Sequence, residues 1–275
     1  MSQRPPTLSD VPLWTLGHAC PMPTNLRTLF KNWPADKLNL LITAQQKRDA
    51  IEEIILKDAY SVAQKLERVN EYLPYALAME KEMKGNQSIT ANKENRFKWK
   101  QTPLVTSKYL DRSFNADFIQ NEVLHVIWLR GVLLLNNAFV QYKADQLEAS
   151  VQSLRESAGV FLYLANDRLR VTTEPVAIEF QAPVFNSFSS LALAEAYSLI
   201  AAKAEADGLA PAAIGKLCYA ISTTYNNAFD AIKAATPEKA IHEQYCNWVN
   251  GIQKYFFALA AINMGYSQAS AQKDG

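Results

Sequence analysis

The side chains of this chain that could perform chemistry are few, and most of them stand alone. The three histidines, His18, His125 and His242, lie far apart in the sequence. His242 and Cys246 are four residues apart, so on a helix they share one face and could supply two ligands to a metal ion. A zinc site needs two further ligands, and the sequence contains no CxxC or HExxH motif. We therefore predict no metal site, and we expect His125 to be a hydrogen-bonded histidine of the core.

Motifs of nucleophilic and phosphate-binding sites are also missing from the sequence. It contains no GxSxG elbow, no P-loop, no GxGxxG and no kinase-type HRD. The carboxylate pairs Glu52 with Glu53 and Glu80 with Glu82 stand close to lysines, which is typical of a solvated helix face. The sequence therefore predicts no catalytic residue and no cofactor, and it favours binding over catalysis.

Charge and cysteine content narrow the class of protein. The 28 Lys and Arg residues nearly balance the 27 Asp and Glu residues, so no bulk electrostatic field draws the chain to nucleic acid or anionic lipid. Three cysteines without paired spacing favour reduced thiols in the cytoplasm over a disulfide framework. The N-terminal segment lacks the apolar core of a signal peptide. We expect a cytoplasmic protein that does not bind nucleic acid.

The most apolar segment, VLHVIWLRGVLLLNNAFV, has the length of a membrane span. It contains His125, Arg130 and two asparagines, which would be costly to place in lipid. We therefore expect a buried helix of a globular fold rather than an integral membrane segment.

The first 35 residues differ from the rest of the chain. Prolines interrupt them, at positions 5, 6, 12, 21, 23 and 34, and only LWTL could form a short strand. We predict an extended N-terminal arm over residues 1–35, followed by one helical domain over residues 36–275. Because the chain holds only 9 glycines and its apolar residues recur at three- and four-residue spacing, helix should dominate that domain.

The first half of the predicted domain contains both helices and a strand. The spacing predicts two or three helices between Asp36 and Met83, with Pro74 kinking or ending the run. Residues 84–96 are polar and are expected to form a loop. FKWKQTPL then alternates aromatic and basic residues, which predicts a strand buried on one face, and Pro103 should confine it to an edge or end it.

The second half is predicted to be a series of helices joined by short turns. Asp207-Gly208 indicates a helix end, Pro211 the start of the next helix, and Thr236-Pro237 a further start. Antiparallel helices joined in this way build a layered slab or a curved solenoid, as in a degenerate tetratricopeptide-like stack. The predicted helices cover about residues 115–141, 145–169, 183–206, 210–235 and 238–267.

Several segments carry a pattern beyond helical periodicity. FKWKQTPL is an aromatic strand, NEVLHVIWLRGVLLLNNAF an apolar helix, and LEASVQSLRESAGVFLYL a helix with the stretch Ala158, Gly159 and Phe161. SSLALAEAYSLIAAKA and IGKLCYAISTTYNNAF follow as a pair of helices. In this order the segments resemble the FxW strand, the A-G-x-F helix, and the SLxLAQAQE and A-K-L-A helices of the Bro domain family. This family includes ALIX, BROX, the rhophilins and fungal PalC.

The resemblance covers roughly residues 36–267. VNEYLPYALAM and SSLALAEA look more like PalC than ALIX, which implies a part in ambient-pH signalling. The chain stops near the point where the family domain adds further helices, which implies a shortened or divergent member or a fragment.

The resemblance also implies a partner and a binding site. Bro domains bind the C-terminal amphipathic helix of the main ESCRT-III filament subunit in an apolar groove, which is helix-in-groove recognition. The family's contact positions fall on Ile200, Ala213 and Leu217, with Lys203 placed to meet an acidic residue of the partner. Ala213 is smaller than the isoleucine usual in the family, and the adjacent Ile214 could compensate. Alternatively, Ile200 and Leu217 simply pack between helices.

Three functions therefore compete. The first is a non-enzymatic adaptor for ESCRT-III, peripheral to endosomes, in endosomal sorting or ambient-pH signalling. The second is a helical scaffold for an unrelated peptide or small GTPase. The third is a helical enzyme with a buried polar pocket around His125 or His242.

Overall fold

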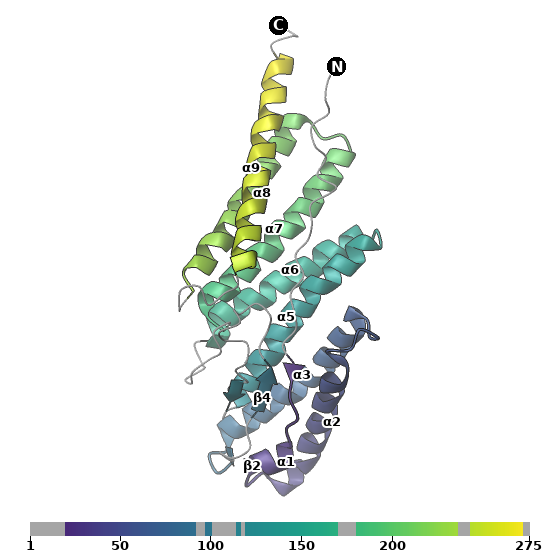
Figure 1. The fold of residues 1–275 in the computed structure, drawn as a ribbon. Helices are drawn as coiled ribbons and strands as arrows, with labels where there is room; N and C mark the ends of the chain where they lie inside the picture. The colour runs from purple at the N-terminus through teal and green to yellow at the C-terminus, as the bar shows by residue number, and fades with distance from the viewer. Residues whose placement is uncertain are drawn as a thin grey trace.

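The computed structural model describes residues 20–91, 97–100, 114–116, 119–169, 180–235 and 243–271. Its helices form an elongated stack with small strands at one end (Figure 1). This confirms the predicted class, a mainly α solenoid of stacked antiparallel helices with a small β element. The helices are α1 (Leu26–Leu29), α2 (Leu38–Ile54), α3 (Val62–Gly85), α5 (Ile119–Lys143), α6 (Leu147–Tyr163), α7 (Ala182–Ala206), α8 (Pro211–Lys233) and α9 (Glu243–Ala271).

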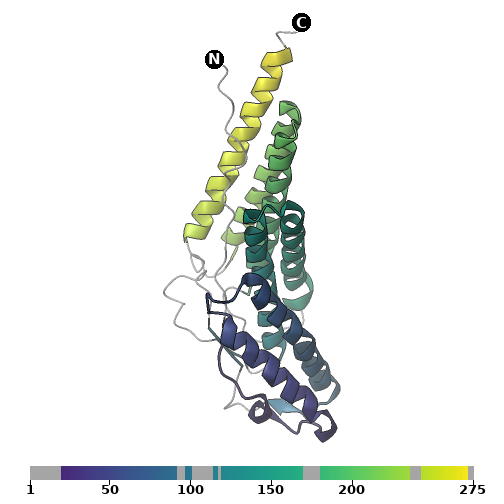
Figure 2. The ribbon, with the colours of Figure 1, turned by 90° about the vertical axis from the view of Figure 1, so that its right-hand side faces the viewer.

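Each long helix packs mainly on the helix before it and the helix after it. The order α2, α3, α5, α6, α7, α8, α9 is also the order of contact along the stack. The view at 90° shows the same succession from α2 at one end to α9 at the other (Figure 2). The hydrophobic core therefore runs continuously along the stack, while each helix within it packs mainly on its immediate neighbours.

The strands form two small antiparallel sheets, the first of which contacts α2 and α5. In the first, β4 (Phe97–Lys100) lies between β1 (Cys20–Pro21) and β5 (Phe114–Ala116). Its side chains alternate between buried and exposed, so the predicted one-face burial is confirmed. Of the two effects predicted for Pro103, confinement to an edge is wrong because β4 is central, whereas the strand does end at Lys100, before Pro103, which lies outside the described residues. The second sheet pairs β2 (Phe30–Lys31) with β3 (Thr90–Ala91).

The described part of the predicted N-terminal arm, residues 20–35, packs on the helical stack. Leu26 and Leu29 of α1 are fully buried, and Asn25 caps this short helix by accepting from the backbone N–H groups of Arg27 and Thr28. The segment also adds β1 to the sheet. LWTL and the earlier prolines lie outside the described residues.

Helix boundaries follow local sequence signals in several places. Ser61 and Gln64 form a reciprocal capping box at the start of α3. The helix does not end at Pro74, which lies inside it. The predicted break after α7 is confirmed: Gly208 takes a left-handed φ of 84°, and Pro211 begins α8. The predicted start at Thr236 lies outside the described residues, and α9 begins at Glu243.

Helix α5 is the buried centre of the N-terminal half. By length and composition it could cross a membrane, but 78% of its most apolar 18-residue window is buried inside the fold. It is therefore the buried helix that the sequence predicts. A Cβ added to Gly131 of α5 would stand 3.0 Å from the ring of Phe161, so this glycine lets α5 and α6 approach closely. Ser157 Oγ donates to the Gly131 carbonyl, 2.8 Å away, at the same contact.

The predicted core histidine is confirmed. His125 is buried on α5, stacks on Trp99 with ring centroids 4.7 Å apart, and meets Phe180 edge-on at 4.3 Å. Its Nδ1 lies 2.7 Å from the carbonyl oxygen of Asn121. Burial lowers the pKa of His125 to about 3, so the ring is neutral at physiological pH.

A buried ionic network joins this half of the fold. The Glu122 carboxylate of α5 accepts from Arg48 Nε of α2 at 2.8 Å, from Tyr72 Oη of α3 at 2.9 Å and from Trp99 Nε1 of β4 at 2.6 Å. Arg48 also donates to the Met22 carbonyl at 2.8 Å. Burial by itself lowers the pKa of Arg48, but the Glu122 charge opposes it and the pKa lies above its usual value. One carboxylate therefore fixes four segments that are distant in sequence.

Candidate partner-binding surface

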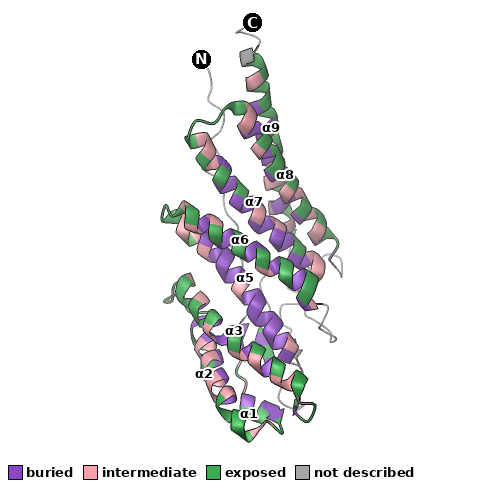
Figure 3. Ribbon diagram, turned by 180° about the vertical axis from the view of Figure 1, so that it is seen from behind, coloured by how far each residue is buried: buried purple, intermediate pink, exposed green. Residues whose placement is uncertain are grey.

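Helix α7 exposes a single uncharged row of side chains. Between Val184 and Ala201 every residue is buried except five, which recur at alternating spacings of four and three. This spacing places them on one face of the helix. In the view from behind, the ribbon of α7 is largely buried, with exposed and intermediate segments recurring along it (Figure 3). The five residues are Asn186, Ser190, Leu193, Tyr197 and Ile200.

The two large apolar side chains of this row are well exposed. Tyr197 is 45% exposed and Ile200 is 44% exposed. Ile200 is therefore not buried by packing between helices, which was the alternative role considered for it in the sequence analysis. Tyr197 was missed at the sequence level, although its position three residues before Ile200 places it on the same face.

Helix α8 contributes a second row beside the first. Ala213, Leu217 and Thr224 are partly buried and Ala220 is exposed, at spacings of four, three and four. Leu217 is partly buried and packs against the core. It therefore takes part in interhelical packing and also reaches the surface. Ile214 is only 2% exposed and belongs to the core, because it lies on the face of α8 that packs into the stack. It therefore cannot compensate for the small Ala213 on the surface.

Helix α9 packs on the other flank of α8. A Cβ on Gly215 would stand 3.0 Å from Met264 Cγ, and Ser222 Oγ donates to the Gln253 carbonyl at 3.0 Å. Gly215 and Ser222 lie on the flank opposite Ala213 and Leu217 on the helical wheel. The two rows therefore face the side of the α7–α8 pair that α9 leaves open. We call this the α7–α8 surface: Leu193, Tyr197, Ile200, Ala213 and Leu217.

A single lysine stands at one end of the α7–α8 surface. The Lys203 side chain is 58% exposed, and its Nζ lies 2.7 Å from Asp207 Oδ1, one helical turn further on. Such exposed pairs contribute little to stability and exchange readily with water. Lys203 is thus accessible to an acidic partner, which would compete with Asp207.

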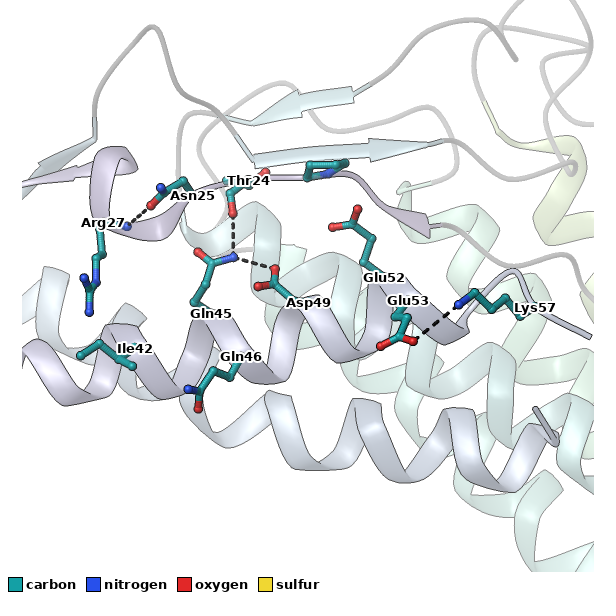
Figure 4. Close-up of a pocket in the computed structure, with 11 residues that line it drawn as sticks. Thr24, Asn25, Arg27, Ile42, Gln45, Gln46, Asp49, Glu52, Glu53 and Lys57 are labelled. Atoms are coloured by element: carbon teal, nitrogen blue, oxygen red, sulfur yellow. Dashed lines mark hydrogen bonds and ion pairs between the residues drawn. The ribbon is translucent and has the colours of Figure 1, made fainter. Parts of the chain in front are cut away.

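A separate hollow of about 1010 Å³ lies between α2 and residues 23–27 (Figure 4). Gln45 links its walls: Nε2 donates to the Thr24 carbonyl at 2.9 Å and to Asp49 Oδ1 at 2.6 Å, and Oε1 accepts from Leu26 N at 2.7 Å. The residues that line it include Asp49, Glu52 and Glu53, but no histidine, cysteine or serine. These contacts fasten the N-terminal segment to α2 and place no nucleophile beside a base.

The helical-enzyme alternative rests on His125 and His242, and only His125 lies among the described residues. His125 is enclosed by aromatic rings, and none of the hollows described is lined by it. Within residues 20–91 and the later described ranges, no group of three His, Cys, Asp or Glu side chains is placed to hold a metal ion. Cys246 is described, whereas His242 lies outside the described residues, so their pairing is not tested.

Similarity to a known family and to solved structures extends over nearly the whole helical stack. The profile of the BRO1-like domain family matches residues 42–275. Among curated protein sequences, none matches this chain. Three solved structures share the fold over nearly its whole length, and at 14–15% identity they establish similarity of fold alone.

The first of these structures is ALIX in complex with the SIVmac239 PYKEVTEDL late domain, with a TM-score of 0.78 and 14% identity over 96% of this chain. The second is a complex of ALIX BRO1 with CHMP4C, with a TM-score of 0.75 and 14% identity over 95% of this chain. The third concerns endosomal targeting by the Bro1 domain, with a TM-score of 0.71 and 15% identity over 94%. The chain spans 38%, 74% and 71% of those three chains, respectively.

Proposed function

Because this chain belongs to the BRO1-like domain family, we propose that it is a non-enzymatic adaptor that binds the C-terminal amphipathic helix of the main ESCRT-III filament subunit. The complex of ALIX BRO1 with CHMP4C supports a partner of this class, since its fold is that of the present chain. We place the helix on the α7–α8 surface.

The observation that carries this proposal is the uncharged row of α7. Between Val184 and Ala201 of α7, the side that meets water presents Leu193, Tyr197 and Ile200, and the rest of this stretch is buried apart from Asn186 and Ser190 on the same row. Fully burying one large apolar side chain is worth about 1.5–3 kcal/mol, and these side chains are already half-buried. A partner helix that covers two or three of them therefore gains a few kcal/mol, which suits a reversible interaction.

The geometry favours a helical partner with apolar anchors at three- and four-residue intervals. Leu193, Tyr197 and Ile200 repeat at this interval along α7, and Ala213 and Leu217 repeat it along α8. Such rows match the apolar face of an amphipathic helix. Lys203 at the end of the surface favours an acidic residue near one end of that helix. Ala213 leaves more room than a larger side chain would, which favours a bulky anchor at that point.

Binding of the CHMP4C C-terminal helix as a synthetic peptide tests the proposal. We expect Ile200→Asp and Leu217→Asp to weaken binding at least tenfold in fluorescence anisotropy, because a carboxylate would have to be desolvated under an apolar anchor. Ile200→Asp is the cleaner variant, since Ile200 is more exposed than Leu217. Unchanged affinity in both variants would exclude the α7–α8 surface.

Phe257→Asp provides a matched control. Phe257 is 54% exposed on α9, so the substitution removes an equally accessible apolar side chain at another place. Binding should remain at the wild-type level in this variant. Equal losses at Ile200 and Phe257 would indicate nonspecific adhesion of apolar surface rather than a site, and would favour the alternative of a scaffold for unrelated peptides or small GTPases.

We further propose that the chain acts in the cytoplasm, peripheral to endosomes, in endosomal sorting or ambient-pH signalling. The similar Bro1 domain that was solved as the structural basis of endosomal targeting supports the location. A fluorescently tagged chain should concentrate on endosomes, and Ile200→Asp should make it diffuse if recruitment depends on the α7–α8 surface. The PalC-like part in pH signalling stays a prediction.

A further inference from the structure

Helix α9 ends the stack with an apolar face exposed to solvent. Helices α3 to α8 each pack between two neighbouring helices, whereas α9, among the described elements, packs mainly on α8 (Figure 2). Its outward residues recur at three- and four-residue spacing, so they share one side of the helix. We call this side the α9 outer face: Phe257, Ala258, Ala261, Ile262, Met264 and Gly265.

The two ends of the stack carry different surfaces. Beyond Leu38, the exposed residues of α2 are all polar: Asn39, Gln46, Asp49 and Glu53. Residues 255–271 of α9, in contrast, contain no Asp, Glu, Lys or Arg. On the α9 outer face Phe257, Ile262 and Met264 are 39–54% exposed. Terminal units of a helical stack usually carry a polar outer face, so α2 closes its end of the stack and α9 has the surface of an internal helix.

The α9 outer face is complementary in shape to a second copy of itself. In an antiparallel pair of α9 helices with a two-fold axis at Ala261, Phe257 of each copy faces a hole on the other copy. Four residues at positions i, i+3, i+4 and i+7 form this hole: Ala261, Met264, Gly265 and Gln268. Ala261 and Gly265 leave room for the ring, because a Cβ added to Gly265 would meet nothing within 4 Å. The symmetry makes the same contact twice.

Lys254 determines which orientation of the pair is favourable. It is exposed on the same side of α9, seven residues before Ala261. In a parallel pair the two Lys254 ammonium groups would lie next to each other. In the antiparallel pair they lie at opposite ends, about 21 Å apart along the helix axis and beyond the Debye length of about 8 Å at physiological ionic strength. The charges therefore favour the same antiparallel pair as the shapes.

The absence of charge in residues 255–271 also selects the occupant. A strongly acidic or basic helix would lose the hydration of its charges without finding an opposite charge there. A second copy of α9 brings no charged side chain into the centre of the contact. Met264 adds a thioether beside the incoming ring of Phe257, which is a favourable contact.

The area of the α9 outer face is that of a weak dimer. An aromatic side chain buries about 150–250 Å² in full, and Phe257 is about half exposed. With its apolar neighbours it offers a few hundred Å² per copy, against about 800 Å² per partner in a standard stable interface. Such a dimer forms reversibly and dissociates on dilution.

We propose that two copies of this chain form a two-fold symmetric, antiparallel dimer through the α9 outer face. This face lies on a different side of the stack from the α7–α8 surface, because α9 packs on the other flank of α8. Each dimer therefore presents two α7–α8 surfaces. Dimer formation is independent of which partner those surfaces bind.

Sedimentation equilibrium of the full chain over a wide range of protein concentrations tests the dimer. The average mass should rise with concentration from that of one chain toward that of two. Phe257→Asp should weaken dimerisation at least tenfold, because it places a carboxylate in both apolar holes. Ile200→Asp is the matched control, since Ile200 is 44% exposed on α7, and it should dimerise like the wild type. A single-chain mass at every concentration, or a dimer unaffected by Phe257→Asp, overturns the proposal.

Gly265→Leu distinguishes a fitted contact from general adhesion of apolar surface. The leucine fills the hole for Phe257 and makes the face more apolar, and the open space at Gly265 allows the fold to accept it. The fitted dimer should weaken, whereas nonspecific adhesion would strengthen, and stronger association overturns the proposed packing. Circular dichroism verifies that each variant is folded. Peptide binding by the Phe257→Asp variant separates the two proposals, because a lost dimer with intact peptide binding leaves the proposed function in place.

Discussion

The two halves of the stack hold their helices together by different chemistry. In the N-terminal half the buried Glu122 carboxylate accepts from Arg48, Tyr72 and Trp99, which lie on three different elements. In the C-terminal half, hydroxyl groups supply several interhelical hydrogen bonds. The one buried carboxylate among the described residues of α7 and α8 is Glu195, whose charge adds to the effect of burial in raising the pKa of Tyr225. Ser187 Oγ of α7 donates to the Ala228 carbonyl of α8 at 2.7 Å and lies 3.0 Å from Tyr245 Oη of α9.

The difference reflects what each half has to join. The N-terminal half combines helices with strands that come from distant parts of the chain. A buried carboxylate that accepts hydrogen bonds from several of these elements can specify that arrangement. In the C-terminal half, α7 and α8 follow one another through a short turn and each helix packs on the next, so hydroxyl contacts and close packing join them. On α7 the exposed row from Asn186 to Ile200 then carries no charged side chain, which suits an apolar contact with a partner helix.

Removing the centre of the ionic network should give the largest effect. Glu122→Ala leaves the guanidinium of Arg48 buried with no carboxylate, and we expect a loss of about 3–5 kcal/mol in the free energy of unfolding. Urea denaturation followed by circular dichroism measures it. A loss under 1 kcal/mol would show that the network does not hold this half together.

The next effect should be a pH dependence that belongs to the N-terminal half. The pKa of His125 is about 3 in the fold and about 6.5 when unfolded, so its neutral form contributes stability that is full above pH 6.5 and is lost as the pH falls toward 3. Between pH 7 and pH 5 this amounts to about 2 kcal/mol.

His125→Phe removes that titration while keeping an aromatic ring between Trp99 and Phe180. Its free energy of unfolding should fall by about 2 kcal/mol less than that of the wild type over the same pH range. Parallel pH profiles of the two proteins would contradict the assignment.

A hydroxyl contact of the C-terminal half should contribute less than the ionic network. Ser187→Ala removes the bonds to Ala228 and Tyr245, and we expect a loss of about 1 kcal/mol in urea denaturation. A loss as large as that of Glu122→Ala would remove the contrast between the halves.

The smallest effect on stability should come from the α7–α8 surface itself. Ile200→Asp and Lys203→Ala alter exposed side chains, so each should change the free energy of unfolding by no more than about 0.5 kcal/mol. Thermal unfolding of the two variants checks this. A clear loss of stability at Ile200 would mean that it belongs to the packing of the fold, and its effect on binding could not then be read as a contact.

Local signals in the sequence determined most of the elements. Helical periodicity located α5 to α9, Gly208 and Pro211 marked the turn between α7 and α8, and the alternation of FKWK gave the buried face of β4. These features depend on residues that are close in sequence, so they can be predicted without knowledge of the tertiary structure. The family also followed from the order of such segments, as the match over residues 42–275 confirms.

Tertiary structure alone decided which flank of each helix remains open. Ile214 and Leu217 are three residues apart on α8, yet the first is in the core and the second reaches the surface, because α7 and α9 cover different sides of that helix. The same holds for the central place of β4 in its sheet. Periodicity shows which residues share a face of a helix. The element that covers that face comes from elsewhere in the chain, so local periodicity in a single sequence does not predict it.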